Sequence, residues 1–246
     1  MAVAIDNAGA GTNNSGSTTL SFSHTASGSE RYAAVPFSIQ NGDTATGVTY
    51  GGVSMTQVIA GVSYGPTNPN TEYAYIYGLV APATGSQTVT ITRSSSTNGI
   101  FASATSLTGV NQTTPINATG SKVGDTATSN ADNTVDVVST VDGCGLLALF
   151  SNNANTNVAQ TGSTSITDYG GNAVFRSTTF PQTTAGSFTF NAHVSGTHQW
   201  AALAIAIQPP SVSAIASING VPLANIASMN GVAIANISSV NGVSNV

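Results

Sequence analysis

The chain has 246 residues, of which only 5% are charged, and its formal net charge is −5. Ordinary soluble domains carry roughly 25% charged residues, so Ser, Thr, Asn and Gly must cover most of the surface here. Four residues are Lys or Arg, and because phosphate contacts need clusters of basic side chains, the composition argues against nucleic-acid binding.

The N-terminal sequence, Met1-Ala-Val-Ala-Ile-Asp6, has neither the basic region nor the apolar core of a secretory signal. The sequence contains no run of 18 apolar residues, so it predicts no transmembrane helix, and no membrane partner is expected. A neutral surface rich in hydroxyls and amides is nevertheless common in extracellular β-proteins. Three explanations would reconcile an extracellular location with the lack of a signal: release of a virion protein by cell lysis, secretion by a system that needs no signal, or a signal that has been removed from this sequence.

Alternation of apolar and polar residues is frequent, whereas helical periodicity is almost absent. The alternating or apolar segments are 18–24, 31–39, 53–59, 72–80, 87–92, 100–107, 134–141, 144–150, 173–180, 186–192 and 199–207. Turn signals separate them at Asn41-Gly42, Gly51-Gly52, Pro82, Asn98-Gly99, Asp142-Gly143, Gly170-Gly171 and Pro181. Ten to thirteen short strands with such turns predict an all-β fold, an antiparallel, jelly-roll-like sandwich. The polar segment 122–133 is expected to be a long loop.

Tyr73, Tyr75 and Tyr77 alternate within 72–80, so the three rings are predicted on one face of a strand. Packing inside the sandwich, a subunit interface and a stacking platform for glycans are all compatible with this row.

Two strands, 144–150 and 200–207, are apolar on both faces. They are expected to be central, with one face in the core and the other under a loop or a neighbouring subunit. The single cysteine, Cys144, excludes an intrachain disulfide and is expected to be a small buried core residue.

Metal ligands and catalytic motifs give weak signals. His193 and His198 lie five residues apart around a turn and could form part of a metal site, but turn-flanking polar residues are the default. Asp125, Asp132 and Asp136 form an acidic patch with Asn130 and Asn133, either a calcium site or a solvated loop. No nucleophile elbow, zinc-protease motif, phosphate loop or Cys-x-x-Cys motif occurs. The sequence therefore predicts neither an enzyme nor a cofactor.

Pro209-Pro210 marks the clearest boundary, because two successive prolines cannot continue a sheet ladder. It divides a sandwich domain at 1–208 from a linker at 209–211 and a tail at 212–246. The tail repeats Ser-apolar-Asn-Gly-Val every 11 residues. It contains no charged residue, since the last one in the chain is Arg176. Fixed-period repeats stack or pair because one unit cannot bury its own apolar side.

Each Asn-Gly of the tail predicts a two-residue hairpin turn. These turns are Asn219-Gly220, Asn230-Gly231 and Asn241-Gly242. The apolar residues predicted to mediate assembly are Ile218, Val221, Ile226, Met229, Val232, Ile234, Ile237, Val240 and Val243. A free tail of this composition would be prone to aggregate, so it is expected to have a partner. Whether it forms hairpins or a strand threaded through a neighbour stays open.

The Asn-Gly-Val repeats resemble short C-terminal repeats of bacteriophage virion and tail-associated proteins. The preceding domain is similar to β-sandwich modules of phage and bacterial surface proteins. The segments that carry this second resemblance are 20–24, 48–53, 79–85 and 200–207. It implies a non-enzymatic structural protein on the virion surface, either a capsid decoration, a fibre-like subunit or a tail component. No catalytic or ligand residues transfer with it.

The expected partners are further copies of the chain, with a trimer as the first guess, and other virion proteins. The alternatives are a glycan-binding adhesin module that recognises surface glycans, or a subunit of an extracellular bacterial filament or surface layer. A polysaccharide-degrading enzyme would need paired acids in a groove, and the nine acidic residues cluster in predicted loops.

Overall fold

Antiparallel β-strands and the turns that connect them build the part of the chain that the computed structural model describes, and no helix occurs in that part. The described residues are 3–13, 16–40, 42–64, 72–95, 99–124, 132–152, 158–161, 164–169, 174–181, 184–194, 199–211 and six two-residue strands between 217 and 244. The predicted all-β class is thus confirmed.

The first half forms a jelly roll. Its strands are β1 (Ala4–Asn13), β2 (Thr19–Ala26), β3 (Tyr32–Ile39), β4 (Ala45–Tyr50), β5 (Val53–Ser54), β6 (Thr56–Tyr64), β7 (Glu72–Val80), β8 (Gly85–Arg93) and β9 (Ile100–Thr108). Sheet A has the order β1-β9-β3-β7-β6, and sheet B has the order β2-β8-β4-β5. Counting β5 and β6 as one strand that passes from sheet B to sheet A gives eight strands in jelly-roll order.

The second half repeats this topology. Its strands are β10 (Ile116–Gly124), β11 (Asp132–Ser139), β12 (Gly145–Asn152), β13 (Val158–Thr161), β14 (Thr164–Tyr169), β15 (Val174–Pro181), β16 (Gly186–Val194) and β17 (Trp200–Ile207). Sheet C has the order β10-β17-β12-β15-β14, and sheet D has the order β11-β16-β13. Replacing each strand of sheets A and B by its counterpart in the second half reproduces sheets C and D.

The register of the two halves agrees in detail. The last residue of the second strand lies opposite a glycine in both jelly rolls, as Ala26 pairs with Gly85 and Ser139 pairs with Gly186. Both glycines have positive φ, at 80° and 154°. The segment expected to be one sandwich therefore contains two jelly rolls with one common topology.

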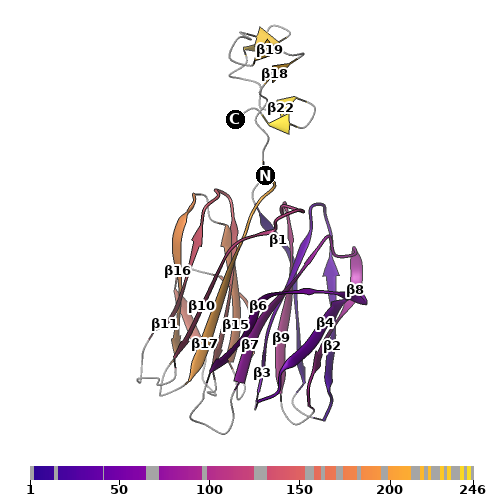
Figure 1. Cartoon of the computed structure of the whole chain (residues 1–246), viewed down its shortest axis with the longest axis vertical. Coiled ribbons are helices and arrows are strands. Elements are labelled where there is room, and N and C mark those ends of the chain that lie inside the picture. The colour runs from indigo at the N-terminus through magenta and orange to yellow at the C-terminus, as the bar shows by residue number, and fades with distance from the viewer. Residues whose placement is uncertain are drawn as a thin grey trace. The chain divides into compact units, whose positions relative to one another are not determined.

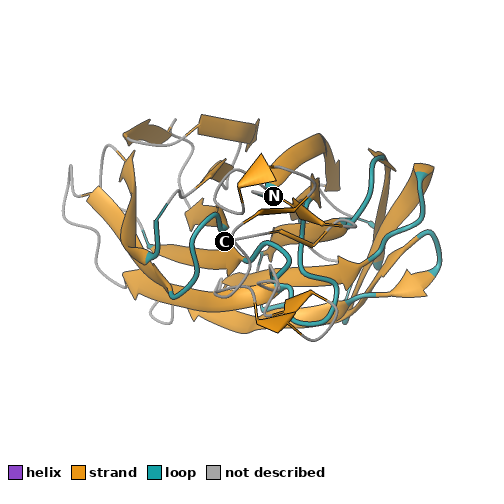
Figure 2. Cartoon of the chain, turned by 90° about the horizontal axis from the view of Figure 1, so that it is seen from above, coloured by secondary structure: helices purple, strands orange, loops and turns teal. Residues whose placement is uncertain are grey.

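Sheets A and C pack face to face, because one buried cluster contains residues of both sheets, so the layers run B, A, C, D. Figure 2 shows the strands from above, in orange. Figure 1 shows the strands of the first half, in indigo to magenta, beside those of the second half, in pink to orange. The core between sheets A and C contains Ala34, Ile76 and Leu107 from the first jelly roll and Leu149 and Leu203 from the second. Separate cores lie between sheets A and B and between sheets C and D.

This layering explains the strands that are apolar on both faces. In β12, Leu147 and Leu149 face sheet A, whereas Leu146 and Ala148 belong to the core against sheet D. The outer face was expected to lie under a loop or a neighbouring subunit. Instead, the other jelly roll of the same chain covers it. Cys144 is fully buried, as expected.

The strand bounds differ from the prediction in a few places. Strands β1, β4, β10, β13 and β14 were not predicted, because Gly and Asn interrupt their alternation or they are short. The segment 122–133, expected to be a loop, contributes its first three residues to β10 and its last two to β11. Residues 125–131 lie outside the described part of the chain.

The chain divides into two compact units, Met1–Pro209 and Pro210–Val246. The second unit contains the six short strands of the tail. They are β18 (Ser217–Ile218), β19 (Val221–Pro222), β20 (Ser228–Met229), β21 (Val232–Ala233), β22 (Ser239–Val240) and β23 (Val243–Ser244).

Candidate functional site

The tail forms three successive hairpins with one register. Ile218 pairs with Val221, Met229 pairs with Val232, and Val240 pairs with Val243. In each case two residues connect the strands, and they are the Asn-Gly pair of the repeat. The strand pairing therefore has the form expected of hairpins. The turn residues themselves, together with Ile226, Ile234 and Ile237, lie outside the described residues.

Each tail hairpin has only two residues in each strand. Even a longer isolated two-stranded hairpin is marginally stable in water, because it buries too little apolar surface to offset the ordering of its backbone. The apolar pairs of these hairpins carry no neighbouring charge in the sequence. Such a unit gains stability by packing against other protein, which makes the tail the first candidate for a binding element.

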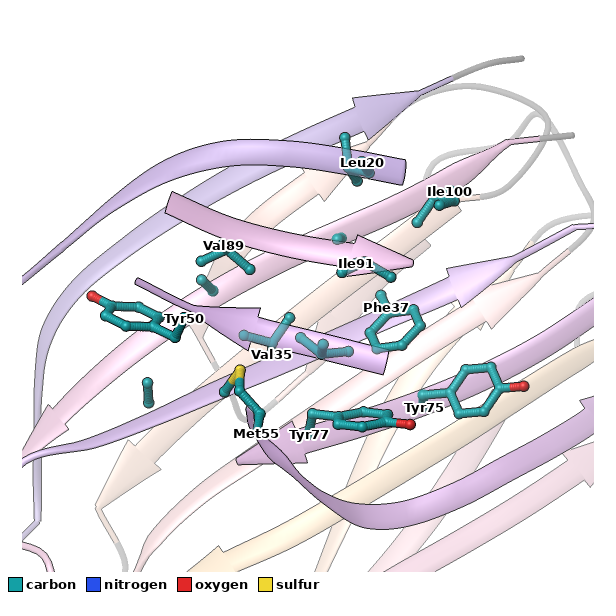
Figure 3. Packing of buried hydrophobic residues seen from close by; sticks show 14 of the residues in the cluster. Leu20, Val35, Phe37, Tyr50, Met55, Tyr75, Tyr77, Val89, Ile91 and Ile100 are labelled. Atoms are coloured by element: carbon teal, nitrogen blue, oxygen red, sulfur yellow. The ribbon is translucent and has the colours of Figure 1, made fainter. Parts of the chain in front are cut away.

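The tyrosine row belongs to the core of the first jelly roll. Tyr75 and Tyr77 are 5% and 7% exposed, and the Phe37 ring stacks on Tyr75 with centroids 5.0 Å apart. Figure 3 shows these two tyrosines beside Phe37 among the buried residues between sheets A and B. The Tyr77 hydroxyl donates to Gln57 Oε1 at 3.0 Å, and Tyr73 packs at the margin of the same cluster. Tyr75 and Tyr77 thus present no open ring face on which a sugar could stack.

A polar cluster that the sequence did not reveal lies near the start of β1. Asp6 is the extra residue of a bulge, since Ile5 pairs with Leu107 and Asn7 pairs with Ser106. A bulge re-aims its side chain, and here the carboxylate accepts hydrogen bonds from Ser27 N at 2.7 Å, from Ser27 Oγ and from Ser106 Oγ at 2.8 Å.

His24 lies next to this carboxylate. Its Nδ1 hydrogen-bonds with the Tyr50 hydroxyl at 3.0 Å, and its Nε2 is 3.4 Å from the Asn7 carbonyl oxygen. Burial lowers the pKa of His24, against the opposing effects of the Asn7 carbonyl and the Asp6 charge. Burial alone would raise the pKa of Asp6, but the hydrogen bonds from Ser27 and Ser106 outweigh it and the pKa is lowered.

The arrangement of this cluster does not match that of a nucleophilic site. A catalytic serine needs a base that accepts its proton, oriented in turn by a third group. Here both serine hydroxyls donate to Asp6, while His24 is bonded to Tyr50 and to the backbone. The cluster instead fastens the bulge of β1 to the end of β2.

A charged pair lies at the opposite end of the first jelly roll. The Arg93 side chain is fully buried, and its Nη1 is 3.6 Å from Asp43 Oδ2. Its Nε and Nη2 donate to the Ser17 carbonyl at 3.1 and 2.7 Å. Arg93 thereby holds the segment before β2 and the segment before β4 together, which is a structural role.

The candidate metal ligands are only partly within the described residues. Asp125, Asn130 and His198 lie outside them, and Asp132 pairs with His193 across β11 and β16. In β11, Asn133 is buried, whereas Asp136 is exposed and accepts a hydrogen bond from Thr189. Among the described residues, no group of three His, Cys, Asp or Glu side chains could hold a metal ion.

An apolar pocket of about 360 Å³ opens where β6 and β7 meet the start of β10. Its walls include Tyr32, Val58, Val80, Pro115 and Ile116. Val58, Val80 and Ile116 are partly buried and pack against the core between sheets A and C, so the pocket lies at the margin of the contact between the two jelly rolls.

Comparisons with family models, with curated proteins and with solved structures gave no match. In the part of the chain that the structure describes, no helix is long and apolar enough to span a membrane.

Proposed function

We propose that this protein is a non-enzymatic structural subunit of a bacteriophage particle and that it assembles through its C-terminal hairpin repeats. The observation that carries the proposal is the tail itself, with three hairpins of one register at 11-residue intervals and no charged residue. Repeated units that cannot bury their own apolar residues gain stability from neighbours. The resemblance of these repeats to those of phage virion proteins supports the particle assignment.

The body suits a structural role. Two jelly rolls that share a central core form one unit with Ser- and Thr-rich outer strands. The polar clusters at Asp6 and at Arg93 connect strands to one another and do not arrange a nucleophile with a base. Tyr75 and Tyr77, the basis of a glycan platform, are buried, so the adhesin alternative loses its main support.

Tail deletion tests the assembly part of the proposal. The full chain and the 1–209 unit are compared by sedimentation velocity and light scattering, with far-UV circular dichroism as the control for folding. We expect the full chain to form a defined oligomer and the 1–209 unit to stay folded and monomeric. An oligomer of the same stoichiometry without the tail would overturn assembly through the repeats.

A separate measurement tests the particle assignment. Mass spectrometry of purified phage particles from the source is expected to detect this chain at a fixed copy number relative to the capsid protein. Recovery of the chain only in cell-surface filaments or layers, with none in the particles, would refute the phage assignment and favour the filament alternative.

A further inference from the structure

The apolar pocket at β6, β7 and β10 lies beside the point where the chain leaves the body. Ile207, the last residue of β17, pairs with Ile116 in the pocket wall. The next residue, Gln208, donates its backbone N–H to the Pro115 carbonyl at 2.9 Å and its Nε2 to Thr114 Oγ1 at 2.7 Å. The body therefore ends, at Gln208 and Pro209, directly next to the wall that Pro115 and Ile116 form.

The pocket accepts aliphatic groups. Its wall residues are apolar apart from the Tyr32 phenol and Thr56, and none carries a charge. The Tyr32 hydroxyl rests on Gly78, where an added Cβ would lie 1.7 Å from it, so the ring is fixed as one wall. With about 360 Å³, the pocket is at the small end of ligand sites, which start at roughly 300 Å³.

The tail offers groups of matching chemistry. Its first hairpin pairs Ile218 with Val221 and has no charged residue within the repeat. Six residues, 211–216, separate Pro210 from this hairpin, and an extended chain covers roughly 3.3 Å per residue. A tail that leaves next to one pocket can thus reach the equivalent pocket of a copy placed around a nearby symmetry axis, as in domain swapping.

We propose that this pocket receives the first tail hairpin, Ser217–Pro222, of a second copy of the chain. Ile218 and Val221 fill the pocket between Val58, Val80 and Ile116, and exchange of tails between copies closes the oligomer. This inference rests on the proposed assembly function and adds the surface that the tail binds.

Closing the pocket in the full chain tests the proposal. Thr56 is exposed and lines the pocket, so Thr56→Trp places an indole over it. Thr88→Trp, on the outer face of sheet B, is the matched control. We expect Thr56→Trp to raise the dissociation constant of the oligomer by about tenfold or more, because the substitution lies at the centre of the proposed interface. The control lies outside this interface and should raise the dissociation constant by less than about threefold. An equal effect of the two variants overturns the proposal.

Two further variants keep the test independent of folding. Thr56→Cys, modified with a bulky maleimide after folding, blocks the same pocket, while Cys144 is fully buried and should stay unmodified. Ile218→Asp puts a charge on the first hairpin, with Val240→Asp on the third hairpin as its control. The modified Thr56→Cys protein and Ile218→Asp should each weaken association, and Val240→Asp should do so less. Association as tight as that of the unchanged chain, in either the modified Thr56→Cys protein or Ile218→Asp, overturns the proposal.

Mixing distinguishes a second copy from the same chain. The Thr56→Trp variant retains an intact tail, and the Ile218→Asp variant retains an intact pocket, so the mixture should associate more tightly than either variant alone. A mixture that associates no more tightly than the single variants would point to docking within one chain and overturn the exchange. If tail deletion abolishes assembly while a blocked pocket does not, only this inference fails and the proposed function stands.

Discussion

Asp6 and Asn117 occupy the same bulge in the two jelly rolls. Each is the residue skipped in the pairing of the first strand with the last, and each accepts the backbone N–H of the residue that follows the second strand. Ser27 N lies 2.7 Å from Asp6, and Thr140 N lies 2.8 Å from Asn117. The same local structure is thus stabilised by a carboxylate in one half and by an amide in the other.

The two bulges should differ in how much stability is lost when the carboxylate and the amide are exchanged. Asp6→Asn should cost less than Asp6→Ala, because an amide oxygen can still accept from Ser27 N, whereas Asp6→Ala removes every acceptor and should cost about 1–2 kcal/mol. Asn117→Asp should cost more than Asp6→Asn, because Asn117 Nδ2 donates to Thr140 Oγ1 and to Gln208 Oε1 at 3.0 and 3.1 Å. Urea unfolding of the four proteins measures these differences. Equal costs for Asp6→Asn and Asn117→Asp would contradict the prediction.

Stability should depend on pH through His24. Its pKa in the folded protein is lowered from 6.5, mainly by burial, so below pH 6.5 the unfolded chain takes up a proton that the folded protein does not. Stability is therefore complete above about pH 6.5 and falls as the pH decreases towards the folded pKa. The His24→Gln variant should lack this contribution, and the difference in melting temperature between it and the parent should change between about pH 7 and pH 5. A constant difference over this range would refute the role of His24.

The pKa of Asp6 is lowered from 3.8, so its contribution is present above that pH and is lost only in more acidic solution. The two residues therefore act in different pH ranges, and the His24 effect can be measured while Asp6 remains ionised.

The core between sheets A and C should make the two jelly rolls unfold together. Leu203 is fully buried in that core, and Leu203→Ala should cost about 2–5 kcal/mol. The fluorescence of Trp200, which lies in the second jelly roll, should follow the same unfolding transition as the far-UV circular dichroism, which reports on both jelly rolls. Val53→Ala, at a position 55% exposed, is the control and should change stability by less than about 0.5 kcal/mol. Two separate transitions would show that each jelly roll unfolds alone.

Close approach of β10 to β11 requires a glycine at position 120. A Cβ there would lie 2.0 Å from the Asp136 carbonyl oxygen, and backbone cannot move aside as a flexible side chain can. Gly120→Ala should therefore cost about 1–3 kcal/mol. Gly47→Ala, where an added Cβ meets nothing within 4 Å, should be neutral or slightly stabilising, because alanine loses less backbone entropy on folding. Thermal melts of both variants measure the contrast, and a similar loss at both positions would contradict it.

The tail hairpins should depend on their glycines. Met229 and Val232 pair across Asn230-Gly231, a connection whose favoured turns need positive φ. Gly231→Val should weaken the hairpin by about 1–2 kcal/mol and reduce assembly, with little change in the melting of the body. Ala233→Ser should have a much smaller effect. Sedimentation equilibrium checks both, and wild-type assembly of Gly231→Val would favour a threaded strand over a hairpin.

Local pattern sufficed for much of the fold. Alternation placed a strand at 72–80, which is β7 (Glu72–Val80), with Tyr75 and Tyr77 on one face and Ala74 and Ile76 on the other. The 11-residue repeat and its Asn-Gly pairs likewise predicted the pairing of the tail. Side-chain period and two-residue turns depend on neighbours within a few residues, so the local sequence was enough to predict them.

The duplication and the layering could be recognised only from the pairing and packing of strands that lie far apart in the sequence. Equivalent strands share an alternation but few residues. His24 and Val137, for example, each lie two residues before the end of the second strand, but one is polar and the other apolar. Strands that are apolar on both faces, such as β12 and β17, predicted a covering layer on each face but not that the other jelly roll of the same chain forms one of them. The partners of Asp6 lie 21 and 100 residues away along the chain, and only the pairing of distant strands brings such groups together.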